Sequence, residues 1–224
     1  GKMDLFDIIG PIMVGPSSSH TAGAVRIGRL TRALLGSEPV HAELLLHGSF
    51  AATGRGHGTD RALIAGLLGM EPDDARIPQS FSLARQRGLT FQFRHGVLQY
   101  AHPNSVQITV QDAAGTDLTV VAASLGGGRV KFTSVDGLPA AFSGERNTLI
   151  IRNQDRVGEV AAMANALSET GVNIAAMQLY RDAKGGQALM VVESDEAISP
   201  ATLERLRGEE GIQRVTYLPM GGDC

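Results

Sequence analysis

The chain has 224 residues and a formal net charge of −3, which allows one large domain or two small ones and gives no general attraction to nucleic acid or anionic membranes. Aromatic residues make up only 4%, Trp is absent, and no window approaches the roughly 20 apolar residues of a membrane span, so neither nucleic acid nor membrane is an expected partner. The single cysteine, Cys224, excludes a disulfide framework or a multi-cysteine cluster site within one chain and fits a reducing cytoplasm.

The first 145 residues show an irregular succession of helices and strands. Apolar spacing predicts a helix over 22–35 and another over 60–68, with Thr59 as a cap. A segment containing Gly, Pro and Ser, 134–145, predicts a linker. The predicted strands are 40–50, a hairpin of 89–93 with 97–100, and a second hairpin of 106–112 with 118–123.

The last third of the chain has a more regular pattern. Helical spacing covers 158–170, with Asp155 as an N-cap, and a second helix begins at Ser199 and Pro200. The order strand–helix–strand–strand–helix–strand is the ferredoxin-like pattern. The predicted class is therefore α+β, with an N-terminal α/β domain over 1–145 and a ferredoxin-like domain over 146–224. The strands of the second domain are 148–152, 172–181, 187–193 and 212–218.

A hydroxyl-rich segment directly precedes the first helix. It contains Ser17, Ser18, Ser19, His20 and Thr21. Hydroxyls and consecutive backbone N–H groups at a helix start favour binding of a carboxylate or phosphate. Considered alone, the segment is better explained as a Ser-rich helix cap, because such caps are far commoner than anion sites.

A glycine-rich segment, 54–60, surrounds a histidine. His57 lies between Gly56 and Gly58, so little side-chain bulk would keep a ligand away from it. An imidazole titrates near neutrality and accepts a proton at working pH. A flexible loop with a solvated histidine is the alternative, but alternating glycines around one titratable residue favour function. The spacing does not match a dinucleotide-binding fingerprint.

Two further segments carry weaker signals. His102 and Asn104 flank Pro103 in a turn, where a plain turn explains them as well as hydrogen bonding to a ligand does. Residues 124–128, Ser-Leu-Gly-Gly-Gly, permit close backbone contact with a ligand or partner, or form a mobile loop. No two of the histidines His20, His57 and His102 share a helix at the spacing of metal ligands, so a zinc enzyme is not expected. No nucleophile elbow is present, so a serine hydrolase is not expected either.

Taken together, these segments resemble the β chains of bacterial iron–sulfur L-serine dehydratases. The resemblance implies a hydro-lyase that removes the Cα proton and the β-hydroxyl of L-serine and yields pyruvate and ammonia. It also implies a [4Fe–4S] cluster whose ligands belong to a separate α chain, because this chain lacks the cysteines. The matching segments, in the family's order, are 6–11, 15–23, 47–60, 102–104 and 124–128.

The resemblance implies a role for each polar residue. His57 is our first choice for the catalytic base, and His20 is the second choice, as partner acid or substrate binder. The substrate-binding set holds the carboxylate and completes the pocket, and no residue of this chain is assigned to a metal. The set is Ser17, Ser18, Ser19, Thr21, Gly58, Thr59, His102 and Asn104.

Segments 153–158 and 171–176 of the second domain resemble the ACT domain, including that of D-3-phosphoglycerate dehydrogenase. The first domain resembles a substrate-binding domain of the same dehydrogenase. ACT domains commonly pair side by side and bind small ligands at the interface, so the resemblance implies a homodimer through the ACT or N-terminal domains. Asp155 stands where the dehydrogenase has an amide side chain. Whether the ACT domain binds serine, a cation or no ligand therefore stays open. The regulatory positions are Asn153, Asp155, Val157, Gly158 and Asn173.

Two alternatives stay open from the sequence. A non-catalytic amino-acid sensor would use the ACT domain to bind ligand and the first domain only to transmit the signal. A dehydratase with L-threonine as substrate would keep the enzyme and change the pocket.

Overall fold

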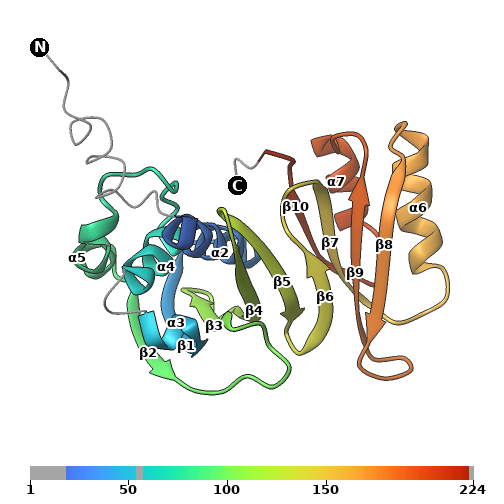
Figure 1. The fold of residues 1–224 in the computed structure, drawn as a ribbon. Coiled ribbons are helices and arrows are strands. Elements are labelled where there is room, and N and C mark those ends of the chain that lie inside the picture. The colour runs from blue at the N-terminus through green and yellow to red at the C-terminus, as the bar shows by residue number, and fades with distance from the viewer. Residues whose placement is uncertain (1–18, 54–57, 222–224) are drawn as a thin grey trace, which may run out of the picture. The chain divides into compact units, whose positions relative to one another are not determined.

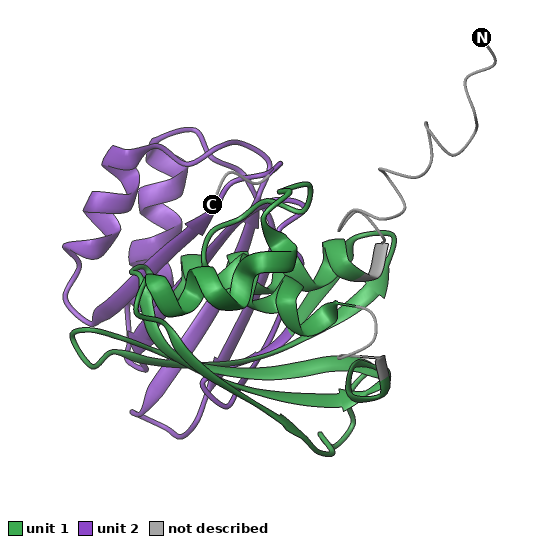
Figure 2. Cartoon of the chain, turned by 90° about the vertical axis from the view of Figure 1, so that its left-hand side faces the viewer, with its two compact units in different colours: residues 1–132 green, residues 133–224 purple. Residues whose placement is uncertain are grey.

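The computed structural model describes residues 19–53 and 58–221. Contacts divide the chain into two compact units, 1–132 and 133–224, which Figure 2 colours separately. One sheet has six strands in the order β2-β1-β3-β4-β5-β6, and the other has four in the order β10-β7-β9-β8. The predicted α+β class is confirmed. Within the described ranges, no helix is long and apolar enough to cross a bilayer.

The first unit is a mixed sheet with helices on one face (Figure 1). β1 runs parallel to β2 and antiparallel to β3. Alternate side chains of β1, such as Leu44 and Leu46, are buried, as the two-residue period of a strand requires. In chain order the elements are α2 (Ser19–Leu35), β1 (Pro39–Gly48), α3 (Ser49–Thr53), α4 (Thr59–Leu67), η1 (Ile77–Gln79), α5 (Ser80–Gln86), β2 (Thr90–His95), β3 (Asn104–Asp112), β4 (Asp117–Gly126) and β5 (Arg129–Val135).

Two glycines set how closely α2 and α4 approach each other. A Cβ atom on Gly28 would lie 2.4 Å from the carbonyl oxygen of Leu63, and one on Gly66 would lie 2.1 Å from that of Val25. Real Cβ atoms essentially never come so near a backbone oxygen. Glycine is therefore required at both positions, and the contact holds the two helices backbone to backbone.

Three predictions for the first unit are wrong. Residues 97–100 form no strand, and β2 instead pairs with β1, a parallel partner distant in sequence. The N-cap of α4 is Gly58 with φ +76°, and Thr59 is already helical. The predicted linker, 134–145, contains the end of β5 and all of β6 (Leu138–Phe142). The predicted boundary at 145/146 thus follows β6, whereas the contacts divide the chain within β5.

The second unit confirms the predicted βαββαβ order. Its elements after β6 are β7 (Asn147–Gln154), α6 (Glu159–Glu169), β8 (Ile174–Arg181), β9 (Gln187–Ser194), α7 (Pro200–Arg207) and β10 (Ile212–Leu218). Leu149 and Ile151 of β7 pack with Met163, Leu167 and Leu206 of the two helices in one buried cluster. This cluster is the core that the helical and strand periods of the sequence predict.

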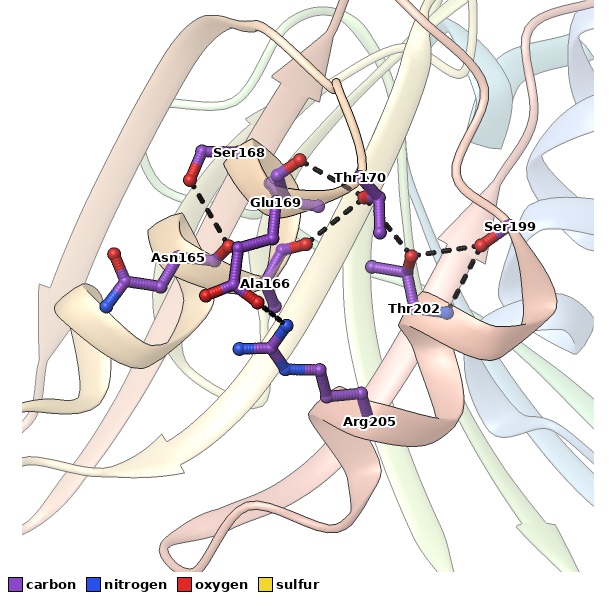
Figure 3. A network of polar contacts seen from close by, with 9 residues as sticks. Asn165, Ala166, Ser168, Glu169, Thr170, Ser199, Thr202 and Arg205 are labelled. Atoms are coloured by element: carbon purple, nitrogen blue, oxygen red, sulfur yellow. Dashed lines mark hydrogen bonds and ion pairs between the residues drawn. The ribbon is translucent and has the colours of Figure 1, made fainter.

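The helix ends of the second unit are fixed by polar contacts, some of which Figure 3 shows. The hydroxyl of Ser199 accepts a hydrogen bond from the backbone N–H of Thr202, which confirms Ser199 as an N-cap. Thr202 in turn contacts the hydroxyl of Thr170 at the end of α6, at 3.3 Å. Asp155 is not the cap of α6, because Gly158 occupies that position with φ +95°.

Candidate functional site

Four strand ends of the first sheet lie at one edge, which we call the site edge. β1 ends at Gly48, opposite Asn104 at the start of β3. Ser105 lies opposite Ala123, so β4 ends beside the start of β3. β2 runs parallel to β1 and ends at the same edge, at His95. Because strand ends and the loops after them are where binding residues concentrate, the site edge is the natural place for a site.

The first turns of α2 and α4 also lie at the site edge. A Cβ atom on Gly23 of α2 would be 2.4 Å from the Oγ of Ser124, at the end of β4. A Cβ atom on Gly58, directly before α4, would be 3.8 Å from the Cγ2 of Thr21 in the first turn of α2. The two helix N-termini therefore meet beside Ser124, and their free N–H groups and partial positive charge favour an anion there.

Three side-chain oxygens at the site edge have no hydrogen-bond partner among the described residues. They are the Oγ1 of Thr59, the Oδ1 of Asn104 and the Oγ of Ser124. Leaving such a buried group unpaired costs about 1–3 kcal/mol. Native proteins retain that cost mostly where water or a ligand completes the hydrogen bonds. The three oxygens are therefore free to bond to water or to a small polar molecule, which makes the site edge the candidate site.

The structure places part of the predicted site. Ser17, Ser18 and His57 lie outside the described residues, as do the side chains of Ser19 and His20, whose backbones begin α2. Gly58 lies beside Thr21, with Thr59 next to it at the start of α4, and Asn104 lies at the end of the neighbouring strands, opposite Gly48. Two of these, Thr21 and Thr59, are buried.

His102 shapes the turn before β3. Its Nδ1 accepts a hydrogen bond from the backbone N–H of Asn104 at 3.1 Å, and its carbonyl oxygen accepts one from the hydroxyl of Ser105 at 2.6 Å. The imidazole is exposed. The turn chemistry that the sequence predicts is thus present, and it orients Asn104, the neighbour with an unpaired oxygen.

The glycine run after β4 is a tight turn against α2. Gly126, Gly127 and Gly128 all have positive φ, at 91°, 64° and 77°. The carbonyl oxygen of Gly128 accepts a hydrogen bond from Arg26 of α2 at 2.9 Å. Three successive left-handed residues are accessible only to glycine without strain, so the run holds the end of β4, and with it Ser124, against the first turns of α2.

Sequence reasoning missed Ser124 and Gly23 as a contacting pair. Ser124 stood out only as the start of a glycine run, and Gly23 only as part of a family segment. Their proximity joins residues about 100 positions apart, which spacing along a chain does not reveal. A small residue one helical turn after a hydroxyl-rich helix start was the available signal.

The predicted regulatory positions of the second unit are dispersed. Asp155 precedes α6 and Asn173 follows it, so the length of an 11-residue helix, about 16 Å, separates them. Asn153 is buried under the helices, and its Oδ1 has no partner among the described residues. Val157 and Gly158 lie at the start of α6, where Val157 is fully exposed. Within one copy, Asn173 therefore lies apart from the other four positions, which are close to the start of α6.

The two polar groups at the ends of α6 are already bonded inside the unit. The Oδ2 of Asp155 accepts hydrogen bonds from the backbone N–H of Gly185 at 3.0 Å and from Arg181 at 2.8 Å. The Gly185 N–H, and then the Arg181 guanidinium, lower the pKa of Asp155 from its ordinary value. The amide of Asn173 donates to Asp195 at 2.8 Å.

Comparisons with known proteins identify a family for each part of the chain. The model of the serine dehydratase beta chain matches residues 3–134, and that of the ACT domain matches residues 147–211. The probable L-serine dehydratase beta chain of Bacillus subtilis is 40% identical over 214 residues, which cover 96% of this chain and 97% of that protein. The chain belongs to the serine dehydratase beta-chain family. The L-serine dehydratase beta chain of Peptoniphilus asaccharolyticus is 37% identical and is covered to 96%.

The resemblance to a dehydrogenase is also found. The D-3-phosphoglycerate dehydrogenase of Bacillus subtilis is 23% identical over 161 residues, which cover 71% of this chain and 30% of the dehydrogenase. The similarity thus extends over parts of both units of this beta chain, but it includes less than a third of the dehydrogenase.

Proposed function

We propose that this chain is the β subunit of an L-serine dehydratase, which deaminates L-serine to pyruvate and ammonia together with an α chain that carries a [4Fe–4S] cluster. One observation carries the proposal: residues of the family's characteristic segments, including Thr21, Thr59, Asn104 and Ser124, lie at one edge of the first sheet, where three buried oxygens have no partner among the residues described. Named relatives that match nearly the whole chain support it.

The cluster is assigned to the α chain from the chemistry of its ligands. Iron–sulfur clusters are held mainly by cysteine thiolates, and this chain has one cysteine. In the part of the chain that the structure describes, no three His, Cys, Asp or Glu side chains gather into a group that would hold a metal. When bound in the α chain, the cluster supplies a Lewis-acidic iron for the β-hydroxyl of the substrate.

The residues at the site edge suit the polar groups of L-serine. The carboxylate fits the N-termini of α2 and α4, where the hydroxyl of Thr59 donates a further hydrogen bond. The Oδ1 of Asn104 is an acceptor and suits the ammonium group. Ser124 both donates and accepts, so it bonds to either group. Fixing the substrate at both charged ends would orient its Cα–H toward one direction.

His57 is the proposed base for the Cα proton, and His20 is the second candidate. His57 directly precedes Gly58, which lies at the site edge, and His20 lies between Ser19 and Thr21 at the start of α2. An imidazole near neutral pKa accepts a proton from carbon most effectively at working pH when it is held near the Cα–H. Both candidates are thus next in sequence to residues that meet at this edge.

Reconstitution tests the proposal. The chain is mixed anaerobically with an α chain whose cluster is intact, and the 2-oxo acid product is measured: pyruvate from L-serine and, in parallel, 2-oxobutyrate from L-threonine. We expect pyruvate from L-serine only when both chains are present. Binding of an amino acid without product from either substrate would favour the sensor instead, and 2-oxobutyrate as the main product would assign the enzyme to L-threonine.

For the second unit we propose side-by-side pairing with a second copy. Asp155 and Asn173 lie at opposite ends of α6 and join one pocket only if an antiparallel neighbour brings its own Asn173 to Asp155. Sedimentation of the isolated chain should then show a dimer. Calorimetry with L-serine and with potassium distinguishes the two ligand classes, and heat from neither would leave the unit purely architectural.

A further inference from the structure

The most exposed apolar side chains of the described part of the first unit lie in one loop. Val97 and Tyr100, in the loop 96–103 between β2 and β3, are 83% and 104% exposed. The other aromatic side chains nearby are covered differently: Phe81 and Phe91 stack with each other and lie under the guanidinium groups of Arg61 and Arg85. Among the described residues of the first unit, the only other large apolar side chain in the exposed class is Leu125, at 38%, so the loop presents most of the uncovered apolar surface.

The loop is held in place. The backbone N–H of Gly96 donates to the carbonyl oxygen of Leu46 at 3.1 Å, and that of Leu98 donates to the Nδ1 of His47 at 3.0 Å. Tyr100 has φ +57°, a left-handed conformation that a tyrosine rarely adopts. A strained backbone that carries a fully exposed aromatic ring is typical of a functional surface.

The position of the loop links it to the site. It leaves the sheet where β2 ends, at the site edge, and it continues directly into His102 and Asn104. A molecule that binds the loop therefore lies beside the unpaired oxygen of Asn104. The proposed reaction needs such a neighbour, because the cluster-bearing chain must reach the substrate.

One arginine stands beside the loop. Of the four arginines in residues 75–111, Arg76 pairs with Asp74, and Arg87 interacts with Glu38 and Asp74. Arg94, two residues before the loop, is exposed and has no ion-pair partner within the described residues. An arginine without a partner beside exposed apolar side chains fits a surface that offers a carboxylate next to an apolar pocket.

From these observations we infer that loop 96–103 with Arg94 is the docking surface for the α chain, whose contact surface is acidic around an apolar pocket for Tyr100. The inference rests on the proposed function and adds the place where the two chains meet. Tyr100 would be the anchor, since aromatic side chains carry much of the affinity of protein interfaces, and Arg94 would steer the approach.

Binding to the α chain tests the surface with three variants. Tyr100→Asn removes the ring and keeps a residue that tolerates positive φ, Arg94→Glu reverses the charge, and Lys131→Glu is the charge control. Lys131 is exposed on β5, which lies four strands from β2 in the same sheet, about 19 Å away. Thermal unfolding of each variant should match the wild type, because all three side chains are exposed.

The expected affinities differ by variant. Tyr100→Asn should raise the Kd for the α chain at least about 10-fold. Arg94→Glu should do so at low salt and lose most of its effect in about 0.5 M salt, and Lys131→Glu should change the Kd less than about 2-fold. Pyruvate formation should return to the wild-type rate when the α chain saturates the variants, since neither side chain is assigned to catalysis.

Each other outcome overturns the inference. If wild-type chain and α chain make pyruvate but both variants bind like the wild type, the surface is wrong and the proposed function stands. If the wild-type chain does not bind the α chain, the function fails as well. The variant Val97→Cys identifies any other molecule that covers the loop. Its thiol should react freely with a thiol reagent until α chain is added, and peptide mapping distinguishes this thiol from that of Cys224. Protection without α chain would mean that this chain covers the loop, with a second copy if protection depends on concentration.

Discussion

The two units use polar side chains in contrasting ways. In the first unit, residues scattered from Thr21 to Ser124 lie at one sheet edge, and three buried oxygens there have no partner in the part of the chain that the structure describes. In the second unit, Asp155 and Asn173 lie at opposite ends of one helix, and each is bonded to groups of its own unit, although the Oδ1 of Asn153 there has no partner among the described residues. The first arrangement is prepared for a ligand within one copy, whereas the second needs another copy to form a site.

This contrast teaches how to read a polar motif. The family resemblance covers both units equally well, but only in the first do the matching residues meet. Unpaired buried oxygens cost stability, so their clustering is physical evidence of a ligand that a motif alone does not give. Bonded groups such as Asp155 serve the fold first, and a ligand there would have to compete with Arg181 and Gly185.

The largest expected effect is that of removing the proposed base. His57→Ala, assembled with the α chain, should lower kcat by about 100- to 10,000-fold, the usual range for general base catalysis, while the absorbance of the cluster is unchanged. His41→Ala is the control, because His41 lies near the other end of β1 and bonds to Thr90. Near-wild-type turnover of His57→Ala would transfer the role to His20 or reject an imidazole base.

The next effect concerns how the site edge is held together. Gly66→Ala would put a methyl group 2.1 Å from the carbonyl oxygen of Val25, so α2 and α4 must separate. We expect a loss of about 1–3 kcal/mol in the free energy of unfolding, as for overpacked interiors, measured with urea. Gly208→Ala has at least 3.5 Å of space and an ordinary φ of −81°, and should be nearly neutral. Equal stability of both variants would contradict the close helix contact.

A smaller effect distinguishes a ligand site from a defect of packing. Thr59→Val and Ser124→Ala each remove an unpaired buried oxygen. If these oxygens serve a ligand, KM for L-serine should rise about 10-fold, while stability stays constant or increases by about 1 kcal/mol. Steady-state kinetics and thermal unfolding of the same samples measure both. Lower stability with an unchanged KM would mean that the oxygens have structural partners.

The smallest effect is a pH dependence in the second unit. Because hydrogen bonds from Gly185 and Arg181 lower the pKa of Asp155, its bonded carboxylate stabilises the β8–β9 turn fully above the unfolded value of about 3.9 and loses that effect as pH falls through the lower folded value. Hydrogen exchange of the Gly185 amide should therefore become less protected at about pH 3 than at pH 6. Asp155→Asn should remove this dependence. A dependence that persists in the variant would assign it to another group.

Local order was predictable from the sequence, and long-range pairing was not. The period of apolar residues predicted α2, α4 and all six elements from β7 to β10, because each buries one face on its own core. The parallel pairing of β1 with β2 was missed, since its partners are joined by about 40 residues of helices and loops. The hairpin of β5 and β6 was mistaken for a linker, although Asp136 and Gly137, both with positive φ, form the turn pair typical of hairpins.

The candidate site divides in the same way. Thr59 and Asn104 were predicted as site residues because their hydroxyl and amide groups stood in turn-rich segments of the family resemblance. Their convergence, and the part played by Ser124, depend on the Gly28–Gly66 contact and on the glycine turn 126–128, which act between distant segments. Sequence spacing carries no record of such contacts.

Titration of the isolated chain with L-serine, followed by its amide NMR signals, tests the contrast between the units most directly. We expect shifts at the amides of the site edge, such as Thr21, Gly23, Thr59 and Ser105, which saturate together. Shifts confined to the surroundings of Asp155 and Asn173, or no shifts at high millimolar L-serine, would contradict the account.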